Sequence, residues 1–238
     1  MSKENSMITR FNQTANGPLH LGHLYSLLVN ERIAHQSGGK FIVRFDDTSS
    51  TTQKLHPDKV RSLALIQKET IEWLGVQVDE WLWQSELRKD IFRMDVYKNW
   101  LQSGLKDMDT VRLPLSIRMA GTQWNPYPYQ VYQTFERVVM DNMSSVTHVI
   151  RGEEFLTEFS LYLYYCDLCN FPHPEFIFLP RLKYSGKDIS KTNGGHTIAE
   201  YRASAYGPEE IIAIVEKAVL EWPPNGWQLW NLKREPEL

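Results

Sequence analysis

Residues 8–45, ITRFNQTANGPLHLGHLYSLLVNERIAHQSGGKFIVRF, determine the fold that we expect for this chain. ITRF has the character of a short strand, and the loop after it contains the turn formers Asn12, Asn16, Gly17 and Pro18. Leucine and isoleucine then recur at helical spacing as far as His35, and two glycines end the pattern. KFIVRF is apolar and contains β-branched side chains, as buried parallel strands do. This order of strand, loop, helix and strand predicts the βαβ unit of a nucleotide-binding sheet.

The rest of the chain continues the alternation of helices and strands. We expect helices over 57–75, 85–103 and 155–169, and strands within 146–152 and in the apolar segment FIFLPRL. The segments VRLPLSIRM and QVYQTFERVVMD, on either side of NPYPY, fit two strands or a strand and a helix. We therefore predict an α/β fold with a Rossmann-like parallel sheet. The catalytic domain is expected to span residues 1–195, and a short helical appendage to span 196–238.

Composition and charge limit the classes of function. With 238 residues, 42% of them hydrophobic and 23% charged, the chain can bury a substantial core. Its first fifteen residues show no secretory signal, and no apolar run approaches the ~20 residues of a membrane span. Together with only two cysteines, this predicts a cytoplasmic protein without a membrane partner. A net charge of −3 gives no overall attraction to nucleic acid, and DNA is not an expected partner.

Two histidines stand where the first loop becomes a helix. The N-terminus of a helix at the carboxyl edge of a parallel sheet favours anions, because its N–H groups are unpaired and carry partial positive charge. Gly17 permits a tight turn before this helix, and Gly22 leaves room for a ligand near the backbone. His20 and His23 are one helical turn apart and would aim ring N–H donors at the same phosphate.

Of two other interpretations of the histidine pair, zinc binding is not favoured and packing in the core remains open. Zinc would need further ligands, and no Cys, His or acidic cluster supplies them at a usual spacing nearby. Histidines packed in the core are the other possibility.

Four ordered segments resemble one enzyme family. RFNQTANGPLHLGH resembles the first signature of class I aminoacyl-tRNA synthetases, and its Arg-Phe opening resembles the glutamyl/glutaminyl branch. GGKFIVRFDDT, SVTHVIRGEEFL and YSGKDISKTNGG resemble further blocks of that branch in the same order, the last being its second ATP signature. IEWLGVQVDEWLWQSELRKDIFRM also follows the family pattern. The resemblance covers nearly the whole chain and implies a glutamyl-tRNA-synthetase-like catalytic domain.

The resemblance implies a ligase that uses ATP with Mg²⁺. In this reaction an amino acid carboxylate attacks the α-phosphate of ATP, so the protein supplies alignment and donors and needs no nucleophile of its own. The implied catalytic residues are His20, His23, Lys187 and Lys191. The implied ATP-binding residues are Gly17, His20, Gly22, His23, Lys187, Ser190 and Lys191. Asp188 departs from the second signature, because the family places its first lysine there.

The same resemblance implies a site for glutamate. Its implied residues are Arg10, Thr14, Asp46, Tyr132 and Arg151. A planar guanidinium grips a carboxylate with two parallel hydrogen bonds, which makes the two arginines the expected determinants of specificity. Asp46 stands where the family uses Glu for the α-amino group, and Tyr132 matches only with one inserted residue.

Cys166 and Cys169 lie near His173 but have no second pair of ligands, so we expect packed thiols and no protein-bound zinc. The similar glutamyl-queuosine tRNA(Asp) synthetases carry a zinc site between their second and third blocks, where this chain has no cysteine.

The acceptor of the activated amino acid remains open. The region at about 105–128 is too short for the family's acceptor-end insertion, and the residues after the second signature are too few for an anticodon module. We expect transfer of glutamate to tRNA or to a tRNA base, although the tRNA-binding surfaces are truncated. The alternatives are the same adenylation chemistry with a small-molecule or protein acceptor, and a catalytically weak paralogue that binds ATP or glutamate.

Overall fold

The computed structural model describes residues 6–48, 52, 55–95, 128–180, 183–184, 187–188 and 197–220, with only the backbone given at 128–132, 157, 183–184, 187–188 and 217–220. Its main sheet has five parallel strands in the order β3-β2-β1-β4-β5. These strands are β1 (Ile8–Thr14), β2 (Lys40–Asp46), β3 (Glu80–Trp83), β4 (His148–Gly152) and β5 (Glu175–Leu179). The strand order reverses between β1 and β4, which is the ligand-binding switch point of doubly wound folds. The predicted Rossmann-like sheet is confirmed.

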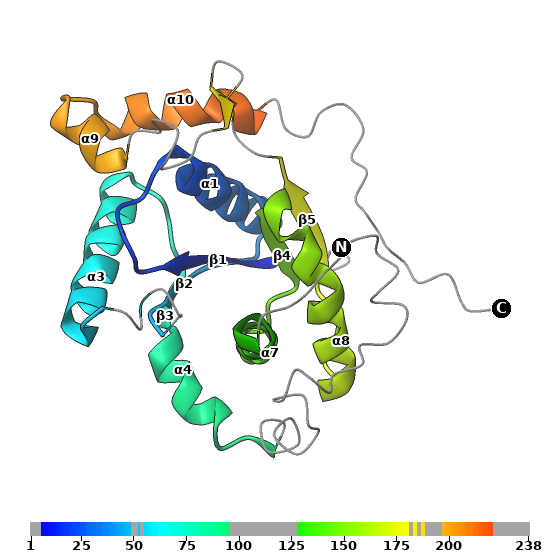
Figure 1. Ribbon diagram of the computed structural model, residues 1–238. Helices are drawn as coiled ribbons and strands as arrows, with labels where there is room; N and C mark the ends of the chain where they lie inside the picture. The colour runs from blue at the N-terminus through cyan, green and yellow to red at the C-terminus, as the bar shows by residue number, and fades with distance from the viewer. Residues whose placement is uncertain are drawn as a thin grey trace.

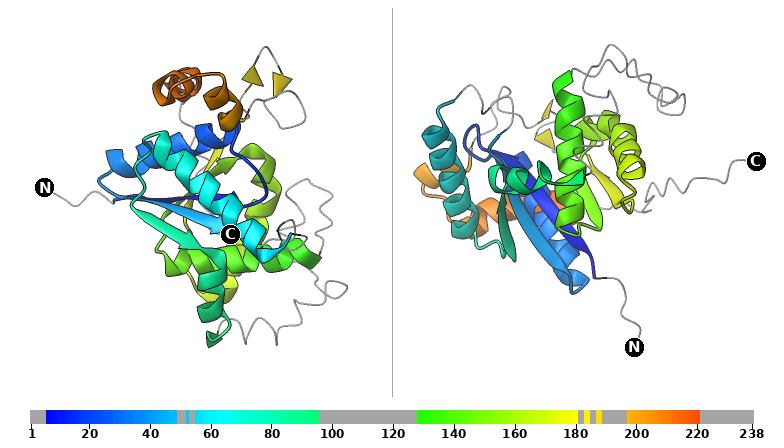
Figure 2. Two further views of the ribbon diagram at one scale, coloured as in Figure 1. Left: turned by 90° about the vertical axis from the view of Figure 1, so that its left-hand side faces the viewer. Right: turned by 90° about the horizontal axis from the view of Figure 1, so that it is seen from below.

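Helices cover both faces of this sheet (Figures 1 and 2). One face carries α1 (Leu21–Gln36), α3 (Pro57–Trp73) and α10 (Pro208–Leu220). The other face carries α4 (Gln84–Ile91), α7 (Pro128–Met143) and α8 (Phe159–Cys169). Two short helices, η1 (Glu153–Glu158) and α9 (Ile198–Ala203), and the hairpin of β6 (Lys183–Tyr184) and β7 (Lys187–Asp188) complete the described elements.

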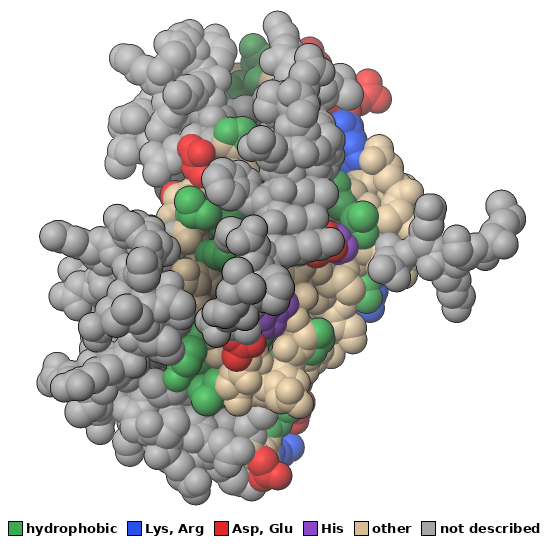
Figure 3. Space-filling view, turned by 90° about the vertical axis from the view of Figure 1, so that its right-hand side faces the viewer, with side chains coloured by type: hydrophobic (Ala, Val, Ile, Leu, Met, Phe, Trp, Pro, Cys, Tyr) green, Lys and Arg blue, Asp and Glu red, His purple; other side chains and the backbone are tan. Residues whose placement is uncertain are grey.

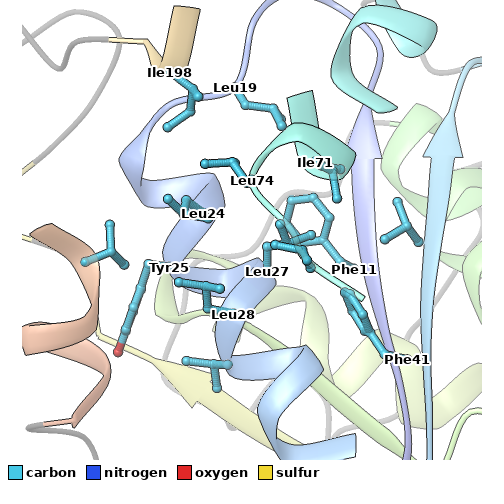
Figure 4. Close-up of a cluster of buried hydrophobic side chains, with 14 of the residues drawn as sticks. Phe11, Leu19, Leu24, Tyr25, Leu27, Leu28, Phe41, Ile71, Leu74 and Ile198 are labelled. Carbon is cyan, nitrogen blue, oxygen red and sulfur yellow. The ribbon is translucent and has the colours of Figure 1, made fainter. Parts of the chain in front are cut away.

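The first core lies between the sheet and helices α1 and α3. Leu24, Leu27 and Leu28 of α1 meet Phe11 and Phe41 of the two central strands there (Figure 4). Ile71 and Leu74, at the end of α3, pack against the same cluster (Figure 4). Burial of such side chains stabilises the fold by roughly 1.5–3 kcal/mol each, so this packing fixes where α1 starts relative to the ends of the strands.

Two glycines explain how α1 turns into β2. Gly38 has a positive φ of 67°, a conformation that side chains with a Cβ rarely adopt. A Cβ on Gly39 would lie 2.0 Å from the carbonyl oxygen of Met7. The predicted end of the first helix at this glycine pair is therefore confirmed.

Two helical segments differ from the sequence-based expectation, and a third decides an alternative that the sequence left open. The helix expected over 85–103 ends at Ile91, where the N–H groups of Arg93 and Met94 bond three residues back instead of four. Residues 96–103 and Gly104 lie outside the described residues, as does VRLPLSIRM. Residues 130–141 are helical throughout, so of the two alternatives for QVYQTFERVVMD the helix is right and the strand is wrong. Phe135, Val138 and Val139 are buried on one face of α7, and this packing overrides the β-propensity of valine.

The helix expected over 155–169 is divided into the 3-10 helix η1 and then α8, with Glu158 at the junction.

The C-terminal helices pack against the first helix. Ile211 and Val215 of α10 belong to the same core as α1, and Ile198 N–H donates to the carbonyl of Leu19 at 2.8 Å. The expected boundary between residues 195 and 196 lies outside the described residues, so the division into two domains stays a prediction. No described helix is long and apolar enough to cross a membrane.

Candidate active site

His20 and His23 form the N-terminal cap of α1. His20 Nδ1 accepts the backbone N–H of Gly22 at 3.1 Å, and His23 Nδ1 accepts the backbone N–H of His20 at 3.3 Å. The two rings stack with centroids 3.7 Å apart. Because both Nδ1 atoms accept, each neutral ring carries its proton on Nε2. The pair therefore serves as a helix cap and as two N–H donors, and neither histidine is buried in the core.

The start of α1 lies at the carboxyl end of β1, beside the switch point. Its first turn contains no acidic residue, so the partial positive charge of the helix N-terminus is not offset by a local side chain. A helix start with two imidazole donors has the right chemistry for a phosphate chain. The residues present therefore fit ATP.

Gln67 holds the loop between β1 and α1, and sequence reasoning missed it. Its side-chain amide donates to the carbonyls of Gly17 at 2.6 Å and Thr14 at 3.2 Å. Gln67 lies on α3 and is only 1% exposed. No local signal could have found it, because only the structure shows that this glutamine is buried and its partners are 50 or more residues away along the chain.

The residues that follow the second ATP signature contact the first signature, at the start of α1. Thr197 forms an isolated antiparallel bridge with His20. Ser190 and Lys191 lie outside the described residues, and Lys187 is described only as backbone in β7. Their contact with ATP remains a prediction.

The strand register places four of the five expected glutamate-site residues on one face of the sheet. Thr14 pairs with Asp46 across β1 and β2, and Arg10 is four residues before Thr14 on the same face. Thr9 pairs with His148, so Arg151 of β4 shares the face of Arg10. This face is covered by α7 and α8. The fifth residue, Tyr132, lies in α7, but its side chain is outside the described part.

Asp141 of α7 organises this face, and sequence reasoning missed it. Its carboxylate accepts two bonds from Nε of Arg10 and one from Nη2, at 2.9–3.2 Å. It also accepts from Arg44 Nη1 and from the Tyr162 hydroxyl, both at 2.8 Å. Burial alone raises the pKa of Asp141, but Arg10 and Arg44 outweigh burial and hold it at about 2. Arg10 is thus held by an internal partner, whereas its Nη1 has no hydrogen-bond partner among the described residues.

Several buried polar atoms beside this pair lack hydrogen-bond partners among the described residues. These are Oδ1 of Asn12, Nη2 of Arg44 and Oδ1 of Asp46, the last of which forms only an ion pair with Arg44 Nε at 3.5 Å. Asn12 and Arg44 are register partners on the face of Arg10. Buried polar groups are rarely left unpaired. These atoms therefore suit the polar groups of an amino acid, and Asn12 joins the candidate residues.

Arg151 lies at the carboxyl end of β4 among three neighbours. Its Nη2 donates to Glu158 Oε2 at 3.3 Å, and the same oxygen accepts from Arg137 Nη1 at 2.8 Å. The Arg151 guanidinium carbon lies 3.9 Å from the centre of the Phe155 ring. Burial, followed by the positive charge of Arg137, lowers the pKa of Arg151.

The two cysteines lie on α8, one of the helices that cover this face. Cys166 is 2% exposed and packs in the core beneath α8, which confirms a packed thiol there. Burial raises the pKa of Cys166 to about 12 and that of Cys169 to about 11. His173 pairs with Asp167 at 2.8 Å. In the described ranges no group of three or more His, Cys, Asp or Glu side chains could hold a metal ion.

On the face shown in Figure 3, the described hydrophobic side chains alternate with acidic, basic and histidine side chains.

Comparison with known families agrees with this geometry. Residues 6–110 and 109–228 match the family described as tRNA synthetases class I (E and Q), catalytic domain. The chain belongs to this family. The resemblance that the four sequence blocks indicated is thereby confirmed, and the His20–His23 cap and Arg151 lie within the residues matched to the class I synthetase catalytic domain.

Individual relatives of this class I synthetase domain are distant. Glutamate–tRNA ligase 1 of Rubrobacter xylanophilus is 26% identical over 252 residues, which cover 93% of this chain and 55% of that relative. The glutamate–tRNA ligase of Sulfolobus acidocaldarius is 35% identical over 94 residues, 40% of this chain and 15% of the relative. The chain spans 55% to 61% of the length of the ligases that it matches over nearly its whole length.

Solved synthetase structures share the fold. A glutamate–tRNA synthetase from Elizabethkingia anophelis superposes with a TM-score of 0.63 at 21% identity, covering 89% of this chain and 61% of that one. A tyrosyl-tRNA synthetase from Archaeoglobus fulgidus superposes with a TM-score of 0.61 at 14% identity, covering 82% and 62%. At these identities the likeness concerns the class I synthetase fold.

Proposed function

We propose that this chain activates glutamate with ATP and passes the glutamyl group to tRNA or to a tRNA base. The observation that carries the proposal is the position of Arg10 and Arg151 on one sheet face, at the switch point where the His20–His23 cap begins α1. This arrangement supports a nucleotide and an anionic amino acid at neighbouring seats.

In the proposed reaction, an oxygen of the glutamate α-carboxylate attacks the α-phosphorus of ATP. The bond from that phosphorus to the oxygen that bridges the α- and β-phosphates breaks, and pyrophosphate leaves; Mg²⁺ would supply further positive charge for the phosphate oxygens. His20 and His23 donate from Nε2 to phosphate oxygens as charge develops on them, with Lys187, Ser190 and Lys191 as further proposed contacts. The acceptor hydroxyl then attacks the glutamyl carbonyl carbon and loses its proton, the bond from that carbon to the phosphate oxygen breaks, and AMP leaves.

The proposed glutamate seat recognises both the positive α-ammonium group and the negative side-chain carboxylate of the amino acid. Asp46 and Asn12 offer acceptor oxygens for the α-ammonium group, with Thr14 beside them. The free Nη1 of Arg10 and the Arg151 guanidinium offer donors for the side-chain carboxylate. A site built this way disfavours glutamine, because a neutral amide leaves a buried guanidinium unpaired.

Pyrophosphate exchange across the amino acids tests this proposal. Wild-type protein with ATP, Mg²⁺ and labelled pyrophosphate should form labelled ATP when glutamate is present, and much less with glutamine or aspartate. Runs with and without bulk tRNA show whether activation needs the acceptor. Absence of glutamate-dependent exchange under both conditions would refute the activity.

The acceptor needs a second assay. Labelled glutamate should become acid-precipitable with bulk tRNA, and ribonuclease should release it. Only 36 residues separate the end of α4 from the start of α7, which is short for an insertion that binds the acceptor end of tRNA. This favours a second candidate function, in which the same adenylation serves a small-molecule or protein acceptor. Exchange with glutamate but no charging of any tRNA would select that candidate.

A further inference from the structure

Glu158 lies between two arginines of the candidate glutamate seat. Its Oε2 accepts from Arg137 Nη1 at 2.8 Å and from Arg151 Nη2 at 3.3 Å. Arg137 comes from α7 and Arg151 from the end of β4, so the carboxylate joins two separate elements. Charge-assisted bonds from arginine to carboxylate are among the strong hydrogen bonds in proteins, and here two guanidiniums converge on one carboxylate oxygen.

This group is enclosed but reachable. The side chains of Arg137, Glu158 and Arg151 are 17%, 12% and 13% exposed. Glu158 stands at the junction of η1 and α8, and neighbouring η1 carries the exposed side chains of Phe155 and Leu156. A short 3-10 helix with few buried contacts can shift without disturbing the core beneath α8.

The ion pairs of this face leave positive charge in excess. They join four arginines to three acids, namely Arg10, Arg44, Arg137 and Arg151 with Asp46, Asp141 and Glu158. Arg10 and Arg137 both repel the charge of Arg151. A further anion would neutralise this positive surplus, which favours its binding.

We infer that Glu158 is an internal stand-in ligand, whose carboxylate fills the seat that Arg137 and Arg151 offer to the side-chain carboxylate of the substrate. The inference rests on the proposed function for the identity of that substrate, a dicarboxylic amino acid. It adds Arg137 to the specificity-determining residues. Because the same donors cannot serve two carboxylates fully, substrate binding exchanges Glu158 for the ligand.

Substitution of Glu158 tests this exchange. Glu158→Gln removes the competing charge, and the Kd for glutamate, measured by calorimetry, should fall about tenfold because the seat is no longer occupied in the free protein. Without ligand the variant should melt at a lower temperature than wild type, since Arg137 and Arg151 then repel each other. Glutarate should raise its melting temperature more than that of wild type.

Two further variants sharpen the result. Arg137→Gln should raise the Kd for glutamate about tenfold or more, because it removes one of the two guanidiniums that Glu158 now joins. Glu216→Gln breaks the Arg32–Glu216 pair at 3.1 Å on the surface of α1 and α10, and serves as the matched control with unchanged Kd. If Glu158→Gln is too unstable to study, Glu158→Asp takes its place. It withdraws the carboxylate by one methylene and should also lower the Kd for glutamate.

The outcomes separate this inference from the proposed function. An unchanged or higher Kd in the Glu158 variants, with glutamate-dependent exchange in wild type, overturns the stand-in role and leaves the function in place. Stabilisation of Glu158→Gln by glutarate, with no exchange in wild type, supports the seat and overturns the function. Equal Kd values for wild type and Arg137→Gln overturn the role of Arg137.

Discussion

His20 and His23 stack at 3.7 Å and cap the first helix, each through its Nδ1. The cap indicates that each ring carries its proton on Nε2, the atom that we propose to contact a phosphate. We therefore expect the structural role and the chemical role to fall on different nitrogens of each ring. Substitutions can separate these roles.

His20→Asn should separate capping from catalysis. Asparagine is a good N-cap, so the melting temperature should stay close to that of wild type, whereas His20→Ala should lose about 1 kcal/mol of stability. Both variants lack the Nε2 donor, and pyrophosphate exchange should fall roughly a hundredfold or more in each. His173→Gln, at a histidine outside the site, is the control. Wild-type exchange by His20→Asn would show that the ring has only a structural role.

Arg151→Ala should affect glutamate far more than ATP. We expect the KM for glutamate to rise by about two orders of magnitude, because a buried guanidinium that grips a carboxylate is lost, with a change of about twofold or less for ATP. Steady-state exchange at varied concentrations of each substrate measures both constants. Arg32→Ala, on the surface of α1, is the matched control. Equal effects on the two KM values would remove Arg151 from the glutamate seat.

Asp141→Asn should destabilise the fold strongly. The substitution leaves Arg10 and Arg44 buried without their shared counter-charge, and removal of one partner of a buried pair typically costs about 3–5 kcal/mol. Urea unfolding at neutral pH measures the change. Asp58→Asn, at a carboxylate exposed at the start of α3, should be nearly neutral. A loss below about 1 kcal/mol would mean that the network is not a major source of stability.

Asp141 should also make stability depend on pH. Its folded pKa of about 2 lies below the ordinary value of 3.8, so the folded state binds the proton less tightly than the unfolded state. The resulting stabilisation, of the order of 2 kcal/mol, is present above about pH 4 and is lost as the pH falls toward 2. Unfolding free energies across this range should show a smaller acid-dependent loss in Asp141→Asn than in wild type. Identical pH profiles would contradict the assignment.

Gln67→Ala should loosen the loop before α1. The two carbonyls that Gln67 holds belong to Thr14 and Gly17, on the path into the histidine cap. We expect the KM for ATP to rise about tenfold and stability to fall by about 1–2 kcal/mol, because buried hydrogen bonds are lost. Gln36→Ala, at an exposed position near the end of α1, controls for the change of residue type. An unchanged KM for ATP would limit Gln67 to a stabilising role.

The family and the secondary structure that carries the candidate site could be predicted because they depend on local signals. The glycine pair after α1, the histidine spacing and the short apolar strands are each set within a few residues, and four such blocks in order identified the synthetase branch. The helical state of residues 130–141 could not be predicted in the same way. Its valines favour strands by themselves, and only burial of Phe135, Val138 and Val139 beneath the sheet decides for a helix.

The sequence by itself determined a Rossmann-like parallel sheet, a histidine pair where the first loop becomes a helix and two arginines at defined strand positions. Only the tertiary structure decided what those arginines touch. Arg10 meets Asp141 across 131 residues of chain, and Arg151 shares Glu158 with Arg137. Strands and turns follow from the spacing of neighbouring residues. The partners of buried charges follow from which helices pack on which face, and packing joins residues that have no relation along the chain.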